Sequence, residues 1–194
     1  MSTFLKRTIV MFAAVALIFP FLADESFAAK KTKDQQRKEI RAMRDKALSK
    51  LYRLEPGSKK AIAGAAGYGV FDLFSLKILV TGSTNGRGIV VDNASRKETF
   101  MKMYRVSAGL GVGAKDFRWV FVFHSKPALN DFINKGWEFG AEAGAAAKDR
   151  KRGGALGNAV SAGPDISVYQ LTEKGLALEA DIGGSKYWKD KDLN

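Results

Sequence analysis

The chain has 194 residues, of which 46% are hydrophobic and 27% are charged, a composition typical of a globular domain with a sizeable core. It has no cysteine and a single histidine. This excludes disulfides, thiolate metal sites and cysteine nucleophiles, and leaves too few ligands for the common zinc sites. The formal net charge of +12 favours anionic partners, either nucleic acid or an anionic membrane surface.

Residues 1–28 are typical of a secretory signal peptide. The basic segment MSTFLKR precedes a 15-residue apolar run that contains Pro20, and Ser26 and Ala28 supply the small residues of a cleavage site. The run is shorter than the roughly 20 residues of a transmembrane helix, so cleavage after Ala28 is favoured over an uncleaved membrane anchor. Without cysteine at the cleavage site, lipoprotein processing is excluded. We therefore expect an exported protein, periplasmic or peripherally attached to the cell envelope.

Residues 29–57 form a basic arm with the periodicity of an amphipathic helix. Between residues 30 and 60, twelve Lys or Arg residues stand against four Asp or Glu residues, a net charge of +8. Asp34 is the expected N-cap, and Pro56-Gly57 is expected to end the helix. Apolar residues recur at three- and four-residue steps, at Ile40, Met43, Ala47, Leu51 and Leu54.

Basic residues flank this apolar stripe on both sides. Arg37, Arg41 and Arg44 lie along one side, and Lys50 lies along the other. One interpretation is a helix that packs its stripe on a sheet and exposes its charges to water. The other is a helix whose stripe enters a lipid interface while its basic residues meet phosphates. The two are compatible if the stripe packs on the sheet while the charges face lipid.

The remaining residues, 58–194, have the pattern of an α+β domain. A second short helix is expected with Ser58 as its cap, and segments with the two-residue period of β-strands follow it. Asn85-Gly86 predicts a hairpin turn between two of these strands. Many short strands separated by turns predict a largely antiparallel β-sandwich or barrel.

One further helix interrupts the predicted strands. In SKPALNDFINKG, Pro127 suits a first helical turn, apolar residues recur at helical steps, and Gly136 ends the segment. The expected fold is therefore α+β, with an N-terminal amphipathic helix and a largely antiparallel sheet that contains one inserted helix.

The segment SAGLGVGAK, residues 107–115, raises the question of a phosphate-binding loop. Its glycines recur at every second residue, and Asp116 follows Lys115. This spacing matches neither G-x-x-x-x-G-K-[ST] nor G-x-G-x-x-G. A two-residue period is that of a strand, so we expect a glycine-faced strand. Residues 148–158 are expected to form an exposed basic loop.

The sequence offers little catalytic chemistry. His124 follows an apolar strand, and no G-x-S-x-G elbow supplies a serine for it. Glu138 and Glu142 would lie about 13 Å apart along a strand, too far for a carboxylate pair that acts on one bond. We expect neither a cofactor nor a metal site, and the protein is not expected to be an enzyme.

Four segments resemble the bacterial branch of the SYLF-domain family. They are FMKMYRVSAGLGVGAKDFRWVFVF, ALNDFINKGWEFGAEAGAAAK, AVSAGPDISVYQLTEKGLALEA and GGSKYWKDKDLN, and the similarity extends over about residues 40–194. The resemblance implies a lipid-binding module. Eukaryotic members bind phosphoinositides through an N-terminal amphipathic helix and a basic surface, and some are linked to actin. Bacterial members are exported, and many are lipoproteins, whereas this chain has no cysteine for a lipid anchor.

Together these observations predict an exported protein that associates with anionic phospholipid surfaces through a basic amphipathic helix, its ligand being a bacterial anionic lipid such as phosphatidylglycerol, cardiolipin or lipid A. The alternatives are a structural or partner-binding envelope protein without a lipid ligand, and nucleic-acid binding. Nucleic acid is disfavoured because the expected compartment holds little of it and no base-reading helix or aromatic RNA-binding sheet pattern is present. The candidate lipid-binding residues are Arg37, Arg41, Arg44, Lys50, Lys59, Lys60, Lys151 and Arg152.

Overall fold

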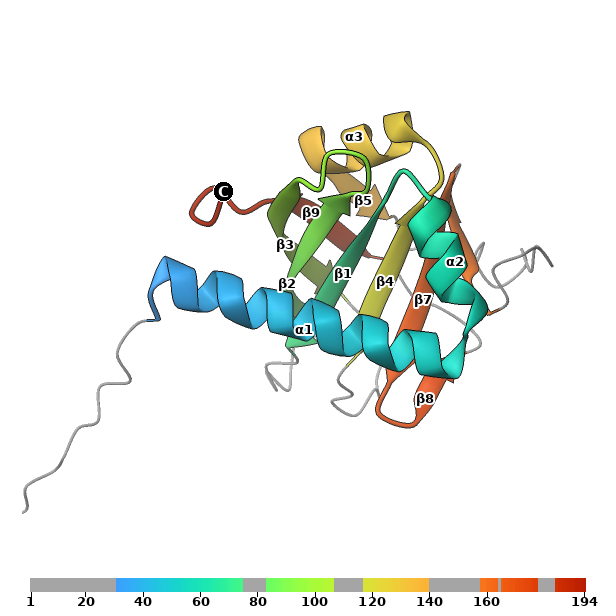
Figure 1. Cartoon of the computed structure of the whole chain (residues 1–194). Coiled ribbons are helices and arrows are strands. Elements are labelled where there is room, and N and C mark those ends of the chain that lie inside the picture. Colours follow the sequence, from blue (N-terminus) through green and yellow to red (C-terminus); the bar gives the residue numbers. More distant parts are fainter. Residues whose placement is uncertain (1–30, 75–82, 107–116, 140–157, 164, 178–183) are drawn as a thin grey trace, which may run out of the picture. The chain divides into compact units, whose positions relative to one another are not determined.

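The structure is a computed structural model that describes residues 31–74, 83–106, 117–139, 158–163, 165–177 and 184–194 (Figure 1). The chain from Lys31 to Asn194 forms one compact unit. The described part of this unit contains three helices and one curled antiparallel sheet, which confirms the α+β fold.

The helices are α1 (Lys33–Leu54), α2 (Gly57–Gly64) and α3 (Lys126–Asn134). The described strands are β1 (Gly67–Phe74), β2 (Ser83–Asp92), β3 (Glu98–Val106), β4 (Arg118–Phe123), β5 (Trp137–Phe139), β6 (Val160–Gly163), β7 (Ile166–Thr172), β8 (Gly175–Ala177) and β9 (Ser185–Lys189). They pair in the order β5-β9-β3-β2-β1-β4-β7-β6, with β8 also on β7.

Successive side chains of a strand point to opposite faces of the sheet, so the hydrophobic core is divided between the two faces. On one face, Phe71 and Phe121 pack with Tyr187 against Phe132 of α3. On the other face, apolar residues of β1, β4 and β7 meet the apolar stripe of α1. This second cluster contains Ala47, Leu48, Leu51, Ile62, Val70, Val120, Val122, Tyr169 and Leu171. In Figure 1, α1 runs across the strands on this face, beside α2.

The N-terminus of α1 differs from the prediction by two residues. Thr32, and not Asp34, is the N-cap: its side chain accepts from the backbone N–H of Gln35, whose side chain accepts in turn from the backbone N–H of Thr32. This reciprocal capping box satisfies two donors that the first turn leaves unpaired. The helix ends at Leu54, before Pro56-Gly57, as predicted.

Ser58 does not cap α2, because the helix begins at Gly57 with Pro56 as its N-cap residue. The hydroxyl of Ser58 donates instead to the carbonyl oxygen of Glu55, at 2.6 Å. Ser58 is fully buried. Its role is therefore to join α2 to the end of α1.

The prediction of a hairpin turn at Asn85-Gly86 is wrong, because both residues lie inside β2 and pair with β1 and β3. A Cβ atom on Gly86 would come within 2.6 Å of the carbonyl oxygen of Asp72 and of a side-chain carbon of Met103. The glycine permits close packing and does not make a turn. The connection from β2 to β3 is made instead by residues 93–97, where the Asp92 carboxylate accepts from the next backbone N–H groups.

The inserted helix is confirmed. The Ser125 side chain accepts from the backbone N–H of Ala128, and Pro127 lies in the first turn of α3. Gly136 follows with a φ of +74°, a left-handed conformation that suits glycine at a helix end. The predicted glycine strand at 107–115 and the basic loop at 148–158 lie outside the described residues, apart from Asn158.

No helix in the described part of the chain combines the length and the apolar character needed to cross a bilayer.

Candidate functional site

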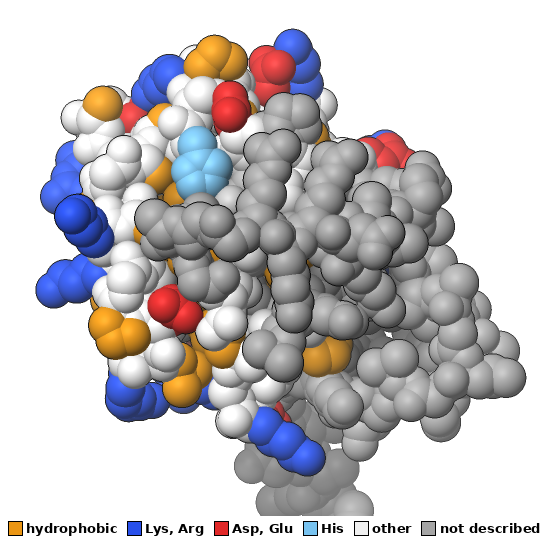
Figure 2. Space-filling view, turned by 90° about the vertical axis from the view of Figure 1, so that its right-hand side faces the viewer, with side chains coloured by type: hydrophobic (Ala, Val, Ile, Leu, Met, Phe, Trp, Pro, Cys, Tyr) orange, Lys and Arg blue, Asp and Glu red, His pale blue; other side chains and the backbone are white. Residues whose placement is uncertain are grey.

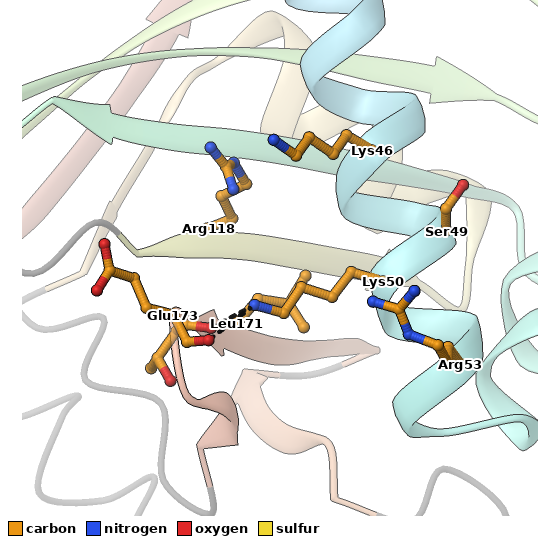
Figure 3. Close-up of a pocket in the computed structure, with 8 residues that line it drawn as sticks. Lys46, Ser49, Lys50, Arg53, Arg118, Leu171 and Glu173 are labelled. Carbon is orange, nitrogen blue, oxygen red and sulfur yellow. Dashed lines mark hydrogen bonds between the residues drawn. The ribbon is translucent and has the colours of Figure 1, made fainter.

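A cavity of about 710 Å³ lies between α1 and the sheet, at the start of β4 and the end of β7 (Figure 3). We call it the cationic cleft. It is lined by Lys46, Ser49, Lys50, Arg53, Arg118, Leu171, Thr172 and Glu173. Four of these side chains are basic and one is acidic, so the cleft carries a strong positive excess.

The helical period explains why three of the basic residues share the cleft. Lys46, Lys50 and Arg53 follow one another at steps of four and three, so they lie along one edge of α1. The apolar stripe beside them fixes the helix on the sheet. Buried apolar contacts, and not the charged residues themselves, thus hold the cleft edge of α1 in place.

The Lys50 ammonium joins α1 to the turn between β7 and β8. Its Nζ donates to the carbonyl oxygen of Thr172 at 2.7 Å and to that of Glu173 at 3.3 Å. Gly175, with a φ of +139°, completes this turn in a conformation that L side chains rarely adopt. Lys50 therefore closes one side of the cleft and brings its charge next to the Glu173 backbone (Figure 3).

Arg118 approaches the cleft from the first position of β4. Its Nε lies 3.4 Å from one carboxylate oxygen of Asp72, and its second contact to that carboxylate is also 3.4 Å long. A charge-assisted hydrogen bond is about 2.7–2.9 Å long. The buried Nε atom has no hydrogen-bond partner of good geometry within the described structure. Arg118 is thus paired only loosely, and its guanidinium points into the space that Lys46 faces (Figure 3).

The opposite edge of α1 is different, because Glu98 of β3 occupies its arginines. Arg41 and Arg44 donate to the two oxygens of Glu98 at 2.7 and 2.6 Å, and Arg44 also contacts Asp45 at 2.8 Å. Arg37 donates to the carbonyl oxygen of Leu193 at 2.9 Å. Sequence analysis had placed these arginines against lipid phosphates, whereas the structure uses their donors within the protein.

The electrostatics of Glu98 agree with this geometry. Burial alone would raise the pKa of its carboxyl group, but hydrogen bonds from Arg41 and Arg44 outweigh it and hold the pKa below the ordinary value. The Arg44 side chain is only 15% exposed. These groups form a partly buried ion-pair cluster between α1 and β3.

The apolar stripe of α1 is also engaged. Ile40, Ala47 and Leu51 are at most 5% exposed against the sheet, and Met43 is half-buried. Of the five predicted stripe residues, Leu54 alone is exposed, at 41%. In this structure the stripe is therefore a packing surface.

Four other predicted lipid-binding residues do not form part of the described site. Lys59 and Lys60 are exposed on α2 and do not line the cleft. Lys151 and Arg152 lie outside the described residues. Of the six candidates that the structure describes, only Lys50 lines the cleft.

Sequence reasoning missed Lys46, Ser49, Arg53 and Arg118. The first three could have been found, because they lie three or four residues from one another or next to Lys50, and such residues share one edge of a helix. Arg118 had no such signal, since it is far from α1 in the sequence and joins it only through the pairing of β4 with β1 and β7.

His124 does not form a recognisable catalytic site. Its Nε2 atom lies 2.9 Å from the Ser167 hydroxyl on the neighbouring strand β7, at an exposed position (Figure 2). Neither residue lines the cleft. In the described ranges, no group of three or more His, Asp or Glu side chains is arranged to hold a metal ion.

Comparison with known proteins finds a family model that matches the C-terminal part of the chain. Residues 104–194 match the model of the family described as Ysc84, Las17-binding protein actin regulator. The matched segment contains Arg118 and the β7 end of the cleft, whereas the α1 edge precedes it.

A relative from Aeromonas veronii, named Beta cell expansion factor A, is 36% identical to this chain over 163 residues. The alignment covers 84% of this chain and 60% of the relative, so the chain spans about three fifths of the relative's length. The family resemblance predicted from the sequence is confirmed by both matches.

Proposed function

We propose that this chain, whose residues 104–194 match the Ysc84, or SYLF, family model, is an exported, non-enzymatic protein that binds anionic phospholipids at the cationic cleft. The signal peptide over residues 1–28 and a periplasmic or peripheral envelope location are part of the same proposal. The sequence predicted lipid contact mainly at the arginine edge of α1. The proposal places this contact at the opposite edge of the helix, which lines the cleft.

The observation that carries this proposal is the charge of the cleft. Lys46, Lys50, Arg53 and Arg118 converge on one cavity in which Glu173 is the acidic lining residue. Lysine and arginine at a lipid surface contribute about 1 kcal/mol each to binding of anionic lipid. Lipid phosphates are the complementary ligand, because each offers oxygens that accept from several cationic donors at once.

A second candidate is an acidic protein segment. The family description names a protein that binds Las17 and regulates actin, and carboxylates would suit the same cationic donors. This alternative predicts binding of a protein and no binding of vesicles. Nucleic acid is a third anionic ligand, and a gel shift with DNA separates it from lipid.

The test is co-sedimentation with phosphatidylglycerol vesicles, using the double variant Lys46→Glu/Arg53→Glu. Both residues are exposed and line the cleft. Removing two cations that contribute about 1 kcal/mol each weakens binding by about thirtyfold, and the two carboxylates introduced in their place weaken it further by repulsion. The matched control is Lys59→Glu/Lys60→Glu, which makes the same change in charge on α2, and we expect a loss of no more than about threefold from general electrostatics.

Melting curves of both variants establish that they are folded. Equal losses in the two variants would assign binding to the overall positive charge and not to the cleft. Failure of the unmodified protein to bind anionic vesicles would reject the lipid proposal outright.

A further inference from the structure

The cationic cleft has a charge balance that matches a doubly charged ligand. The charged residues among its described lining are four cations and Glu173. Asp72 of β1, which pairs with Arg118, adds one more carboxylate at the edge of the site. Among the residues that the structure describes, the excess is therefore two positive charges. A phosphate diester carries one negative charge, whereas a phosphate monoester carries about −1.5 to −2 at neutral pH.

From this balance we propose that the cleft selects phosphate monoesters over phosphate diesters. The inference rests on the proposed function and specifies the headgroup: a lipid whose phosphate is esterified only once, such as phosphatidic acid. Phosphatidylglycerol and other diester lipids then bind more weakly at the same surface charge.

The donors of the cleft also fit the three terminal oxygens of a monoester. The planar fork of Arg118 can take two oxygens side by side, and its long contacts with Asp72, at 3.4 Å, leave it easily redirected. Lys46 faces the same space from α1 (Figure 3). A diester has only two terminal oxygens, so one of these donors would be left without a phosphate acceptor.

Lys50 and Arg53 complete the donor set. Two of the three N–H donors of Lys50 have backbone carbonyl acceptors, so its third is available to a ligand. Arg53 is exposed at the next position along the helix edge. The tightly paired arginines of the opposite edge, at 2.6 and 2.7 Å from Glu98, offer no comparable set.

Binding at this site has a distinctive dependence on pH. The charged groups that face it are Lys46, Lys50 and Arg53 from α1, Arg118 from β4, Asp72 from β1 and Glu173 from the β7–β8 turn. The chain's single histidine does not line the cleft. A monoester gains its second charge near pH 6. Its binding should therefore strengthen as the pH rises through this interval, whereas binding of a diester should not change.

The experiment compares phosphatidylcholine vesicles that contain either phosphatidic acid or phosphatidylglycerol, adjusted to equal zeta potential. At about pH 7.5 we expect the protein to bind the phosphatidic acid vesicles about fivefold to tenfold more tightly, from one additional charge in contact with the cleft. The preference should diminish at about pH 5.5. It should also disappear in Lys46→Glu/Arg53→Glu and persist in Lys59→Glu/Lys60→Glu.

A soluble arm distinguishes a lipid from a free phosphate. Glycerol phosphate, a monoester, and glycerophosphoglycerol, a diester, are titrated into the protein by calorimetry. Preference for glycerol phosphate without any vesicle binding would support monoester selection and overturn the lipid proposal. Equal binding of the two kinds of vesicle, lost in the cleft variant, would overturn monoester selection and leave lipid binding intact.

Discussion

At the scale of single residues, the arginines of α1 beside Glu98 and the arginine of the cleft differ in how closely they are paired. Arg41 and Arg44 lie within 2.7 Å of Glu98 oxygens, whereas Arg118 lies 3.4 Å from Asp72. The sequence predicted which basic residues flank the apolar stripe. It could not predict which of them are neutralised, because Glu98 is more than 50 residues away along the chain. Which arginines are paired depends on where the fold places Glu98 of β3 beside α1.

The Glu98 cluster makes a prediction about stability. Replacing Glu98 by Gln leaves two partly buried guanidinium groups without their carboxylate. We expect the free energy of unfolding at pH 7 to fall by about 1–3 kcal/mol, as measured by urea denaturation. The control is Glu39→Gln, which removes a carboxylate of the exposed Lys31–Glu39 pair and should change the free energy of unfolding by less than about 0.5 kcal/mol.

The same variant carries a pH signature. The pKa of Glu98 is lower in the folded protein than its ordinary value of 4.5, so its contribution to stability is present above that value. It is lost as the pH falls through the lowered folded pKa. The difference between the unmodified protein and Glu98→Gln should therefore be constant from about pH 6 to pH 8 and shrink below about pH 4. A difference that grows on acidification would contradict the ion-pair assignment.

At the scale of elements, the sequence predicted α1 well because its signals are local. The apolar period, the stop before Pro56 and the flanking charges were all correct. The errors arose where local patterns have two meanings. Asn85-Gly86 occurs in turns, but Gly86 is needed here for close packing between β1 and β3. Glycine chosen for close approach cannot be distinguished from glycine chosen for a turn until the strand register is known.

Whether the stripe of α1 is a packing surface can be tested by one pair of substitutions. Leu51 is fully buried against the sheet, whereas Leu54, one helical turn later, is 41% exposed. Leu51→Ala should lower the free energy of unfolding by about 2–5 kcal/mol, because it leaves a cavity in the core. Leu54→Ala makes the same chemical change and should cost less than about 0.5 kcal/mol. Similar small losses for both would mean that α1 is not held on the sheet in solution, and the stripe would again be a candidate for insertion into lipid.

At the scale of the whole molecule, the two ends of the described unit hold each other. Arg37 near the start of α1 donates to the carbonyl oxygen of Leu193. The Asn194 side chain both accepts from the backbone N–H of Phe100 and donates to its carbonyl oxygen. The terminal segment KYWKDKDLN, part of the sequence resemblance, therefore completes the fold beside β3 and α1. Such a role could not be inferred from the motif, since it depends on contacts between residues up to 156 positions apart.

The organisation of the chain leads to a last prediction, about processing on export. The predicted cleavage after Ala28 lies ahead of the compact unit that begins at Lys31 and of the Thr32 cap. Within residues 1–28, two basic residues balance two acidic ones. The mature protein would therefore keep the full charge of +12 and arrive at the envelope with its cationic cleft intact.

Mass spectrometry of the protein from a secreting bacterial host provides the measurement. We expect a chain that begins at Ala29 and is released from the periplasm by osmotic shock. Ala28→Arg, which removes the small residue required at the cleavage site, should cause the uncleaved precursor to accumulate at the membrane. Changing the neighbouring Ala29 to Ser should have no such effect. An unprocessed wild-type chain that remains in the membrane after a carbonate wash would instead identify residues 1–28 as an anchor. The cleft would then bind lipid beside the chain's own membrane anchor. Vesicle binding by the folded unit alone would underestimate the affinity in the cell, because the anchor raises the effective concentration of lipid at the cleft.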